Sequence, residues 1–142
     1  MRLLLDTCVI SEMRKADMNP RLKELMDVVD EKDVFLSVIS LGEIVKGISL
    51  LEESKRKREL SSWVGGLERI FSDRILEIDQ ETAHIWGEVT AKAQKIGKTV
   101  SACDGLIAAI ALKHGLHLAT RNSADFLPMG VMLIDPWAVI GQ

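Results

Sequence analysis

The chain has 142 residues, of which 47% are hydrophobic and 27% charged, and its formal net charge is −3. This composition is that of a folded globular protein, it excludes an intrinsically disordered chain, and the length predicts a single domain over residues 1–142. No apolar stretch approaches the roughly 20 residues of a membrane span, and the N-terminus leads into a strand rather than a signal peptide, so we expect a cytoplasmic protein without membrane contact.

Apolar runs and turn residues predict strands that alternate with helices. The predicted strands cover residues 3–5, 34–36, 75–78, 116–120 and 131–134. The predicted helices cover residues 9–14, a segment that begins at Asn19-Pro20, the segment around Glu43, the stripe 60–71, residues 80–96, and the segment from Asp104 to His114. Such alternation favours an α/β fold with a central parallel sheet of about five strands and helices on both faces.

Four carboxylates follow predicted strands. Asp6 comes directly after the strand 3–5, and Glu43 lies just inside the helix after the strand 34–36. Asp104 lies in the first turn of its helix, and Asp125 follows the strand 116–120. In an open α/β sheet, ligands bind in the crevice beyond the carboxyl ends of the strands. We therefore expect all four acids to point into that crevice.

Two of these acids also have a purely structural interpretation. Glu43 follows Ser40 and Asp104 follows Ser101 at the spacing of a capping box, in which the third residue of a helix is an acid. Either acid could serve only to stabilise the start of its helix.

The acids outside helices have structural interpretations as well. Asp6 could form a turn and Asp125 an Asx turn. A turn does not explain why an ionisable residue directly follows three leucines, because a buried carboxylate is unfavourable unless it is paired or metal-bound. Asp79 and Asp135 also end strands, and we interpret them as a helix N-cap and a turn residue.

Several segments together resemble the PIN-domain ribonucleases, in particular the VapC-like toxins of toxin-antitoxin modules. The segments are Leu5-Asp6-Thr7, Ser40 to Glu43, residues 102–109, and Thr120-Arg121-Asn122 to Asp125-Phe126. The resemblance extends over nearly the whole chain, and residues 5–12 and 135–137 are most similar to the FitB-type branch. It implies a PIN-like fold and metal-dependent cleavage of RNA that leaves a 5′-phosphate and a 3′-hydroxyl.

The resemblance also implies partners. Toxins of this type form homodimers and are inhibited by a small VapB-like antitoxin whose C-terminal segment enters the acid site. Contact with DNA is then indirect, through the antitoxin.

Hard divalent cations prefer oxygen ligands, so four acids suit Mg²⁺ or Mn²⁺. We assign Asp6, Glu43 and Asp104 to metal binding, with Asp125 in support through water or a second ion. Such an ion would activate a water molecule for in-line attack on a phosphodiester. The side chains expected to contact these acids or a phosphate are Thr7, Ser37, Thr120, Arg121 and Asn122.

The two cysteines depart from the family pattern. The family usually has Asn where this chain has Cys8, and commonly a small residue where it has Cys103. The thiol at position 8 could loosen metal binding or leave it unchanged. A redox-sensitive or thiolate-ligated site is one interpretation of the pair, and two small buried hydrophobic residues are the other.

The acidic net charge contrasts with the Lys and Arg contacts on which nucleic-acid binding usually depends. The four acids of the predicted site account for part of the negative net charge. Positive charge is clustered at residues 14–15 and 55–58. The second cluster could be an RNA-binding patch or a solvated helix start beside Glu52 and Glu53. Aromatic residues make up only 4% of the chain, which favours recognition of RNA shape and backbone over base stacking.

Two other classes of function are compatible with clustered acids. One is a PIN protein with a housekeeping role or without activity. The other is a receiver-like signalling domain that binds Mg²⁺, which would require paired acids after the first strand and a Lys after the last. This chain has only Asp6 at the first position and Pro136-Trp137 at the last.

Overall fold

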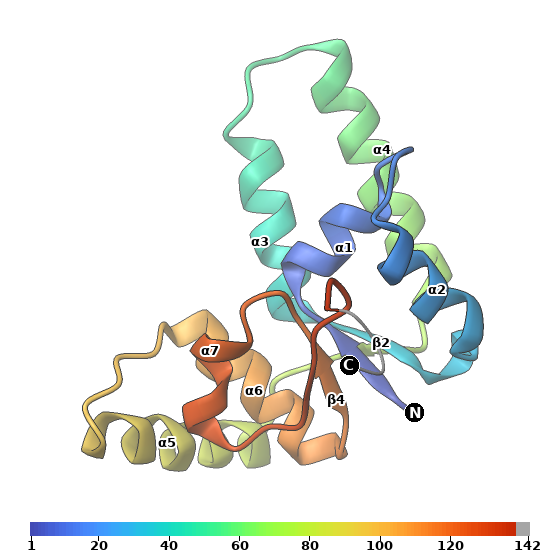
Figure 1. Cartoon of the computed structure of the whole chain (residues 1–142). Helices are drawn as coiled ribbons and strands as arrows, with labels where there is room; N and C mark the ends of the chain where they lie inside the picture. The colour runs from blue at the N-terminus through green and yellow to red at the C-terminus, as the bar shows by residue number, and fades with distance from the viewer. Residues whose placement is uncertain (139–142) are drawn as a thin grey trace.

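Short parallel strands form the centre of the molecule in the computed structural model, which describes residues 1–138 (Figure 1). Within these residues the sheet has five strands in the order β3-β2-β1-β4-β5. Their bounds are Leu3–Leu5 (β1), Val34–Ser37 (β2), Ile75–Leu76 (β3), His117–Ala119 (β4) and Leu133–Ile134 (β5). Every neighbouring pair is parallel, which confirms the predicted sheet.

Helices connect the strands, as expected for parallel strands, which cannot be joined by tight hairpins. The α-helices of the described part are Thr7–Met13 (α1), Pro20–Val28 (α2), Val38–Ser49 (α3), Lys55–Ile70 (α4), Gln80–Lys95 (α5), Ala102–His114 (α6) and Ser123–Phe126 (α7). Single 3₁₀ turns cover Glu31–Asp33 (η1) and Leu127–Met129 (η2). No helix of this part is both long and apolar enough to cross a membrane.

The alternation of side chains along β1 divides the core into two layers. Leu3 and Leu5 pack on one face of the sheet with buried residues of α1 to α4, and Leu4 packs on the other face with buried residues of α6 and α7. The helices therefore cover both faces, as predicted. Figure 1 shows α3 and α4 extending together from the sheet and joined by a loop at their far end.

Several predicted helix ends are confirmed by their capping contacts. The Asn19 side chain accepts hydrogen bonds from the backbone amides of residues 21 and 22, before Pro20 at the first helical position. Asp79 caps α5 through the amide of residue 82, and Gly115 ends α6 with φ = 64°. A left-handed residue at this position satisfies carbonyls of the last turn, and glycine adopts it without strain.

Three predicted strands are longer than the observed ones. Residues 77 and 78 lie outside β3, and β4 and β5 each begin later than expected, at His117 and Leu133. Leu116 and Val131 are buried although they lie outside β4 and β5, whereas Ile78 beyond β3 is exposed. Helix α1, by contrast, begins earlier than predicted. It starts at Thr7, two residues before the predicted start, because Asp6 serves as its N-cap.

Candidate active site

The strand order places a crevice at the carboxyl end of the sheet. The chain runs from β1 outward to β2 and β3 and then returns to the other side of β1 for β4 and β5. Connections therefore leave β1 and β4 in opposite directions, which opens a ligand-binding position between their ends. Asp6 follows β1 at this point, and its amide donates to the carbonyl of Ala119 at 3.0 Å.

Asp6 is buried, with 6% of its surface exposed, and both carboxylate oxygens are held. Oδ1 accepts from the Thr7 amide at 2.8 Å, and Oδ2 accepts from the Thr120 hydroxyl at 2.7 Å. Thr120 lies at the end of β4, so the two strands at the switch point fix one carboxylate between them. The Thr7 contact makes Asp6 the N-cap of α1 rather than a turn residue, and the contact to Thr120 exceeds what a helix cap requires.

Glu43 lies one turn further into its helix than a capping box requires, so the capping interpretation of this residue is wrong. The N-cap of α3 is Ser37, whose side chain accepts from the amide of Ser40 at 3.0 Å, and Ser40 is itself helical. Glu43 is exposed, and its Oε1 accepts from the Thr7 hydroxyl at 2.7 Å. That hydroxyl also lies 3.1 Å from Ser40 Oγ. One threonine thus links the end of β1 to the helix that follows β2.

Asp104 lies close enough to the other three acids to feel their charges. Burial is the largest cause that raises the pKa of Asp104, and the charges of Asp6, Asp125 and Glu43 raise it further. A hydrogen bond with Ser101 opposes these effects. The Asp104 amide donates to the Ser101 hydroxyl at 3.1 Å, so Asp104 occupies the predicted capping position and also belongs to the acid group.

Asp125 lies in a short helix, α7, that the sequence analysis did not predict. It is in the first turn of α7, and its amide donates to the Asn122 carbonyl at 3.0 Å. The Asx-turn interpretation is therefore wrong, because a one-turn helix sets the position of this side chain. Such a turn is too short to show helical periodicity in the sequence.

The donor set fits a hard divalent cation in chemistry, since all four groups are carboxylates. Among residues 1–138, however, no three Asp, Glu, His or Cys side chains stand close enough to hold one ion together. Mg²⁺ usually takes only one or two carboxylates directly and keeps several water ligands. A wider ring of acids around such an ion is compatible with that preference, and the ligand set remains a prediction.

The neighbouring polar residues are arranged around Asp6 and α3. Ser37 is buried as the cap of α3, and Thr120 Oγ1 accepts from the Asn122 amide at 3.0 Å. Arg121 lies over the ring of Trp137, 5.2 Å from its centroid, and forms no ion pair with any other described residue. Its exposed position leaves it available for a phosphate.

Cys8 contacts the site through its thiol, which lies 3.7 Å from Asp6 Oδ2. Burial raises the pKa of Cys8, as does the charge of Asp6, so the protonated thiol is favoured. A protonated thiol is a poor nucleophile and a poor metal ligand. The structure therefore favours a small, partly buried side chain over a thiolate at this position.

The two acids excluded from the site are explained by local contacts. Asp79 caps α5 and pairs with Lys113, whose ammonium holds the pKa of that carboxyl well below its usual range. Asp135 accepts from the amide of Trp137 at 2.8 Å, which is the predicted turn contact.

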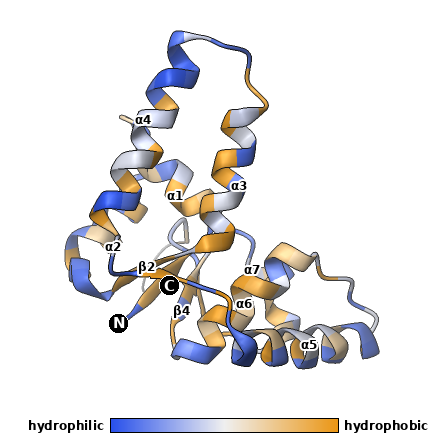
Figure 2. Ribbon diagram, turned by 180° about the vertical axis from the view of Figure 1, so that it is seen from behind, coloured by the Kyte–Doolittle hydropathy of each residue, from blue (hydrophilic) through white to orange (hydrophobic). Residues whose placement is uncertain are grey.

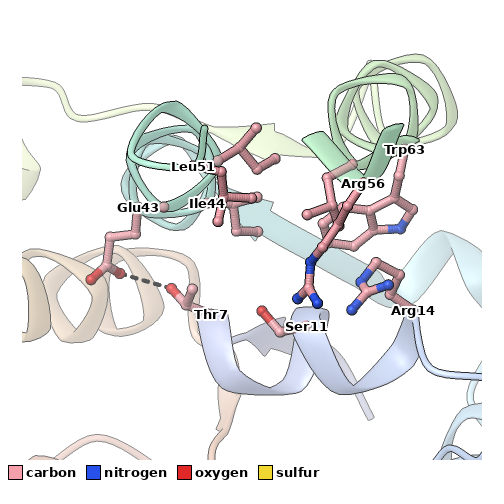
Figure 3. Close-up of a pocket in the computed structure, with 11 residues that line it drawn as sticks. Thr7, Ser11, Arg14, Glu43, Ile44, Leu51, Arg56 and Trp63 are labelled. Atoms are coloured by element: carbon pink, nitrogen blue, oxygen red, sulfur yellow. Dashed lines mark hydrogen bonds between the residues drawn. The ribbon is translucent and has the colours of Figure 1, made fainter. Parts of the chain in front are cut away.

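A cleft of about 360 Å³ that the sequence did not reveal adjoins the acids (Figure 3). Thr7 and Glu43 form one end of it, and its lining comes from α1, α3 and α4. The other lining residues are Ser11, Arg14, Ile44, Gly47, Ile48, Leu51, Arg56, Leu60 and Trp63. The sequence signal was present in the two basic clusters, but nothing in their spacing indicates that Arg14 and Arg56 share one cavity.

Replacing Thr120 by valine is expected to lower the free energy of unfolding by about 1–3 kcal/mol, because the buried Asp6 oxygen and the Asn122 amide would lose their partner. Urea denaturation measures the change. Thr120→Ser keeps the hydroxyl and serves as the control. Equal losses for both variants would show that packing of the Thr120 methyl group, rather than the hydrogen bonds, stabilises this position.

Fold and site together define an α/β protein with carboxylates gathered at the switch point of its sheet. The PIN domain family model matches residues 3–127, and the chain belongs to this family. It is 36% identical to Toxin FitB of Neisseria gonorrhoeae over 95% of this chain and 98% of that protein. It is 30% identical to VapC ribonuclease Y4jK of Sinorhizobium fredii over 95% and 97% of the two chains. A solved structure of FitAB bound to the IR36 DNA fragment superimposes with a TM-score of 0.90, at 35% identity and 96% coverage of both chains.

These comparisons confirm the predicted resemblance to PIN toxins and to the FitB-type branch. They also set aside the receiver-like alternative. Receiver domains have the strand order 2-1-3-4-5, whereas this sheet has the order β3-β2-β1-β4-β5.

Proposed function

We propose that this chain is the toxin of a toxin-antitoxin module, a metal-dependent endoribonuclease that acts on RNA in the cytoplasm. The observation that carries the proposal is the gathering of four carboxylates, of which Asp6, Glu43 and Asp125 all raise the pKa of Asp104. Like charges gathered in a crevice are stabilised by a cation, and perturbed carboxyls of this kind are typical of functional sites. Similarity to relatives named as a toxin and as a ribonuclease supports the same activity.

In this proposal Asp6, Glu43 and Asp104 hold Mg²⁺ or Mn²⁺, and Asp125 supports the ion through water. When bound, the ion would supply Lewis-acid stabilisation of the phosphate and a more acidic water. The protein orients the carboxylates that would hold the ion. Thr120 and the Thr7 amide fix both oxygens of Asp6, and the Thr7 hydroxyl fixes Glu43, so the acids are ordered before substrate binds.

The reaction that fits these groups is hydrolysis with water as the nucleophile. The water oxygen attacks phosphorus, the bond from phosphorus to O3′ breaks, and the leaving oxygen takes a proton. The products are a 5′-phosphate and a 3′-hydroxyl, as the family resemblance implies.

The proposal includes partners. A small VapB-like antitoxin would inhibit the chain, and two copies of the chain would form a homodimer. The similar FitAB structure is bound to DNA, and we propose that DNA contact by this chain also takes place indirectly, through the antitoxin.

The test is cleavage of total bacterial RNA by the purified chain. We expect cleavage with Mg²⁺ or Mn²⁺, loss of cleavage in EDTA, recovery when metal is restored, and 5′-phosphate ends on the products. Asp104→Asn should lose cleavage, and Asp135→Asn is its matched control, because the Asp135 side chain makes only its local turn contact. Cleavage that persists in EDTA, or products with 2′,3′-cyclic phosphate ends, would contradict the mechanism. A folded chain without cleavage under any of these conditions would favour an inactive PIN protein.

A further inference from the structure

The cleft beside the acids contains two arginines from distant parts of the chain. Arg14 ends α1, and Arg56 lies in the first turn of α4. Figure 3 shows both guanidinium groups pointing into the cleft near Ser11, with the Glu43 carboxylate at the opposite end. The fold therefore brings one residue of each basic cluster to the same cavity.

Neither arginine is neutralised by the described part of the chain. The ion pairs of residues 1–138 include neither Arg14 nor Arg56. Arg14 instead lies over the Trp63 ring, 6.0 Å from its centroid, which limits the positions of its side chain. Two adjacent cations without a carboxylate partner are a site for an anion, and the guanidinium fork matches phosphate oxygens in pairs.

The two lysines next to Arg56 in sequence, unlike Arg56, form ion pairs within the chain. Lys55 pairs with Glu59, and Lys57 pairs with Glu53 and donates to the carbonyl of Leu51 at 3.0 Å. The interpretation as a solvated helix start fits Lys55, which is exposed, whereas Lys57 is partly buried. Figure 2 shows the start of α4 as strongly hydrophilic. The positive end of the α4 dipole adds to the charge of Arg56 at this point.

A polar row connects the arginines to the acids. Thr7, Ser11 and Arg14 are separated by four and three residues along α1 and so lie on one face of that helix. The rise of an α-helix places Arg14 about 10 Å from Thr7 along the axis. The two guanidinium groups lie at the end of the cleft opposite Glu43, so they suit a phosphate of a neighbouring nucleotide rather than the phosphate at the acids.

We propose that Arg14 and Arg56 bind a backbone phosphate of the RNA strand on one side of the bond that is hydrolysed, with the strand lying along the cleft. This inference rests on the proposed function. It also explains how a chain of net charge −3 retains a polyanionic substrate, because the acids repel RNA and a local positive site offsets that repulsion.

The test compares RNA binding by the wild-type chain with binding by the double variant Arg14→Gln/Arg56→Gln. The probe is a fluorescent single-stranded RNA of mixed sequence, followed by anisotropy in EDTA over a series of KCl concentrations. We expect the Kd of the double variant to rise roughly 10- to 100-fold, the range for loss of charge-assisted hydrogen bonds. The slope of log Kd against log salt should fall by about 0.7, the value for one neutralised phosphate of a single strand.

Two sets of controls separate charge from shape. The variant Lys55→Gln/Arg58→Gln has the same total change in net charge but lies outside the cleft, and its Kd should change less than that of the cleft variant. Gly47 lines the cleft, and a Cβ there would meet no atom within 4 Å. Gly47→Phe should therefore weaken binding by filling the cleft without a change in charge, and Gly47→Ala should not.

The outcomes distinguish the two proposals. Equal Kd and equal salt slope for the wild type and the Arg14/Arg56 variant, with the wild type cleaving RNA, would overturn this inference and leave the proposed function standing. The cleft would then be assigned to a protein partner. A folded wild type that neither binds nor cleaves RNA would overturn the proposed function and this inference together.

Discussion

Induced expression of the wild-type chain is expected to arrest growth, and replacing Asp104 by asparagine is expected to abolish that arrest and to make the fold more stable. Activity should fall about 100-fold or more, because a metal site contributes several kcal/mol of stabilisation to the transition state. Stability should rise because the carboxylate is partly buried among three other acids, which the uncharged amide does not repel. Growth in a bacterial host and thermal unfolding of the purified proteins measure the two effects.

The stability difference between Asp104→Asn and the wild type should depend on pH. The pKa of Asp104 in the folded chain is raised above its ordinary value of 3.8, so the folded state binds a proton more readily than the unfolded state. The ionised Asp104 carboxylate therefore lowers the free energy of unfolding at neutral pH. This destabilisation disappears as pH falls through the raised pKa. The difference in Tm between Asp104→Asn and wild type should be largest near neutral pH and should shrink as pH falls towards 3.8.

Mg²⁺ should reverse the order of stability. Added ion should raise the Tm of the wild type more than that of Asp104→Asn, because only the wild type keeps the full set of acids. Arrest by both proteins at equal soluble levels would contradict the role of the acids. A lower Tm for the variant in the absence of metal would show that Asp104 serves mainly to cap α6.

Replacing Gly105 by alanine is expected to destabilise the fold by about 1–3 kcal/mol, the usual range for overpacking. A Cβ at Gly105 would lie 2.7 Å from Cγ2 of Thr90 and 2.9 Å from two ring atoms of Trp86. Neither neighbour is the free end of a flexible chain, so α5 and α6 would have to separate. For a chain of this size, each kcal/mol corresponds to a fall in Tm of roughly 4 °C.

Gly87→Ala is the matched control for this prediction. It lies in the interior of α5, where an added Cβ would meet no atom within 4 Å. Alanine there should stabilise the fold by about 0.4–1 kcal/mol, because it restricts the unfolded chain. Opposite signs for the two variants would establish close helix packing at Gly105. A neutral or stabilising effect of Gly105→Ala would contradict it.

The elements were predictable from the sequence where a local interaction defines them. Asn19 with Pro20, Asp79 and Gly115 mark helix ends through contacts within a few residues, and the structure has each of them in the predicted place. The exact start of α3 was not predictable, because Ser37 and Ser40 both have the chemistry of an N-cap. The choice between them depends on where β2 stops pairing with its neighbours.

The gathering of the acids could be anticipated from sheet geometry, and Thr7 and Thr120 were expected among their contacts, but the acid that each threonine binds was not. The hydrogen bonds from Thr120 to Asp6 and from Thr7 to Glu43 join residues that are distant in sequence. No local pattern encodes such pairs, because they arise from the strand order. The shared cleft of Arg14 and Arg56 has the same origin, since the packing of α3 against both α1 and α4 sets it.

The contact between Asp6 and Thr120 also has a consequence for synthesis on the ribosome. Asp6 is among the first residues to emerge, but its partner Thr120 follows 114 positions later, and β1 remains without one neighbour until β4 has been made. The nascent chain therefore cannot complete the acid group until β4 and Thr120 have left the exit tunnel. Under the proposed function, the acid site would therefore stay incomplete until β4 pairs with β1, which would give the proposed antitoxin time to be present at that point.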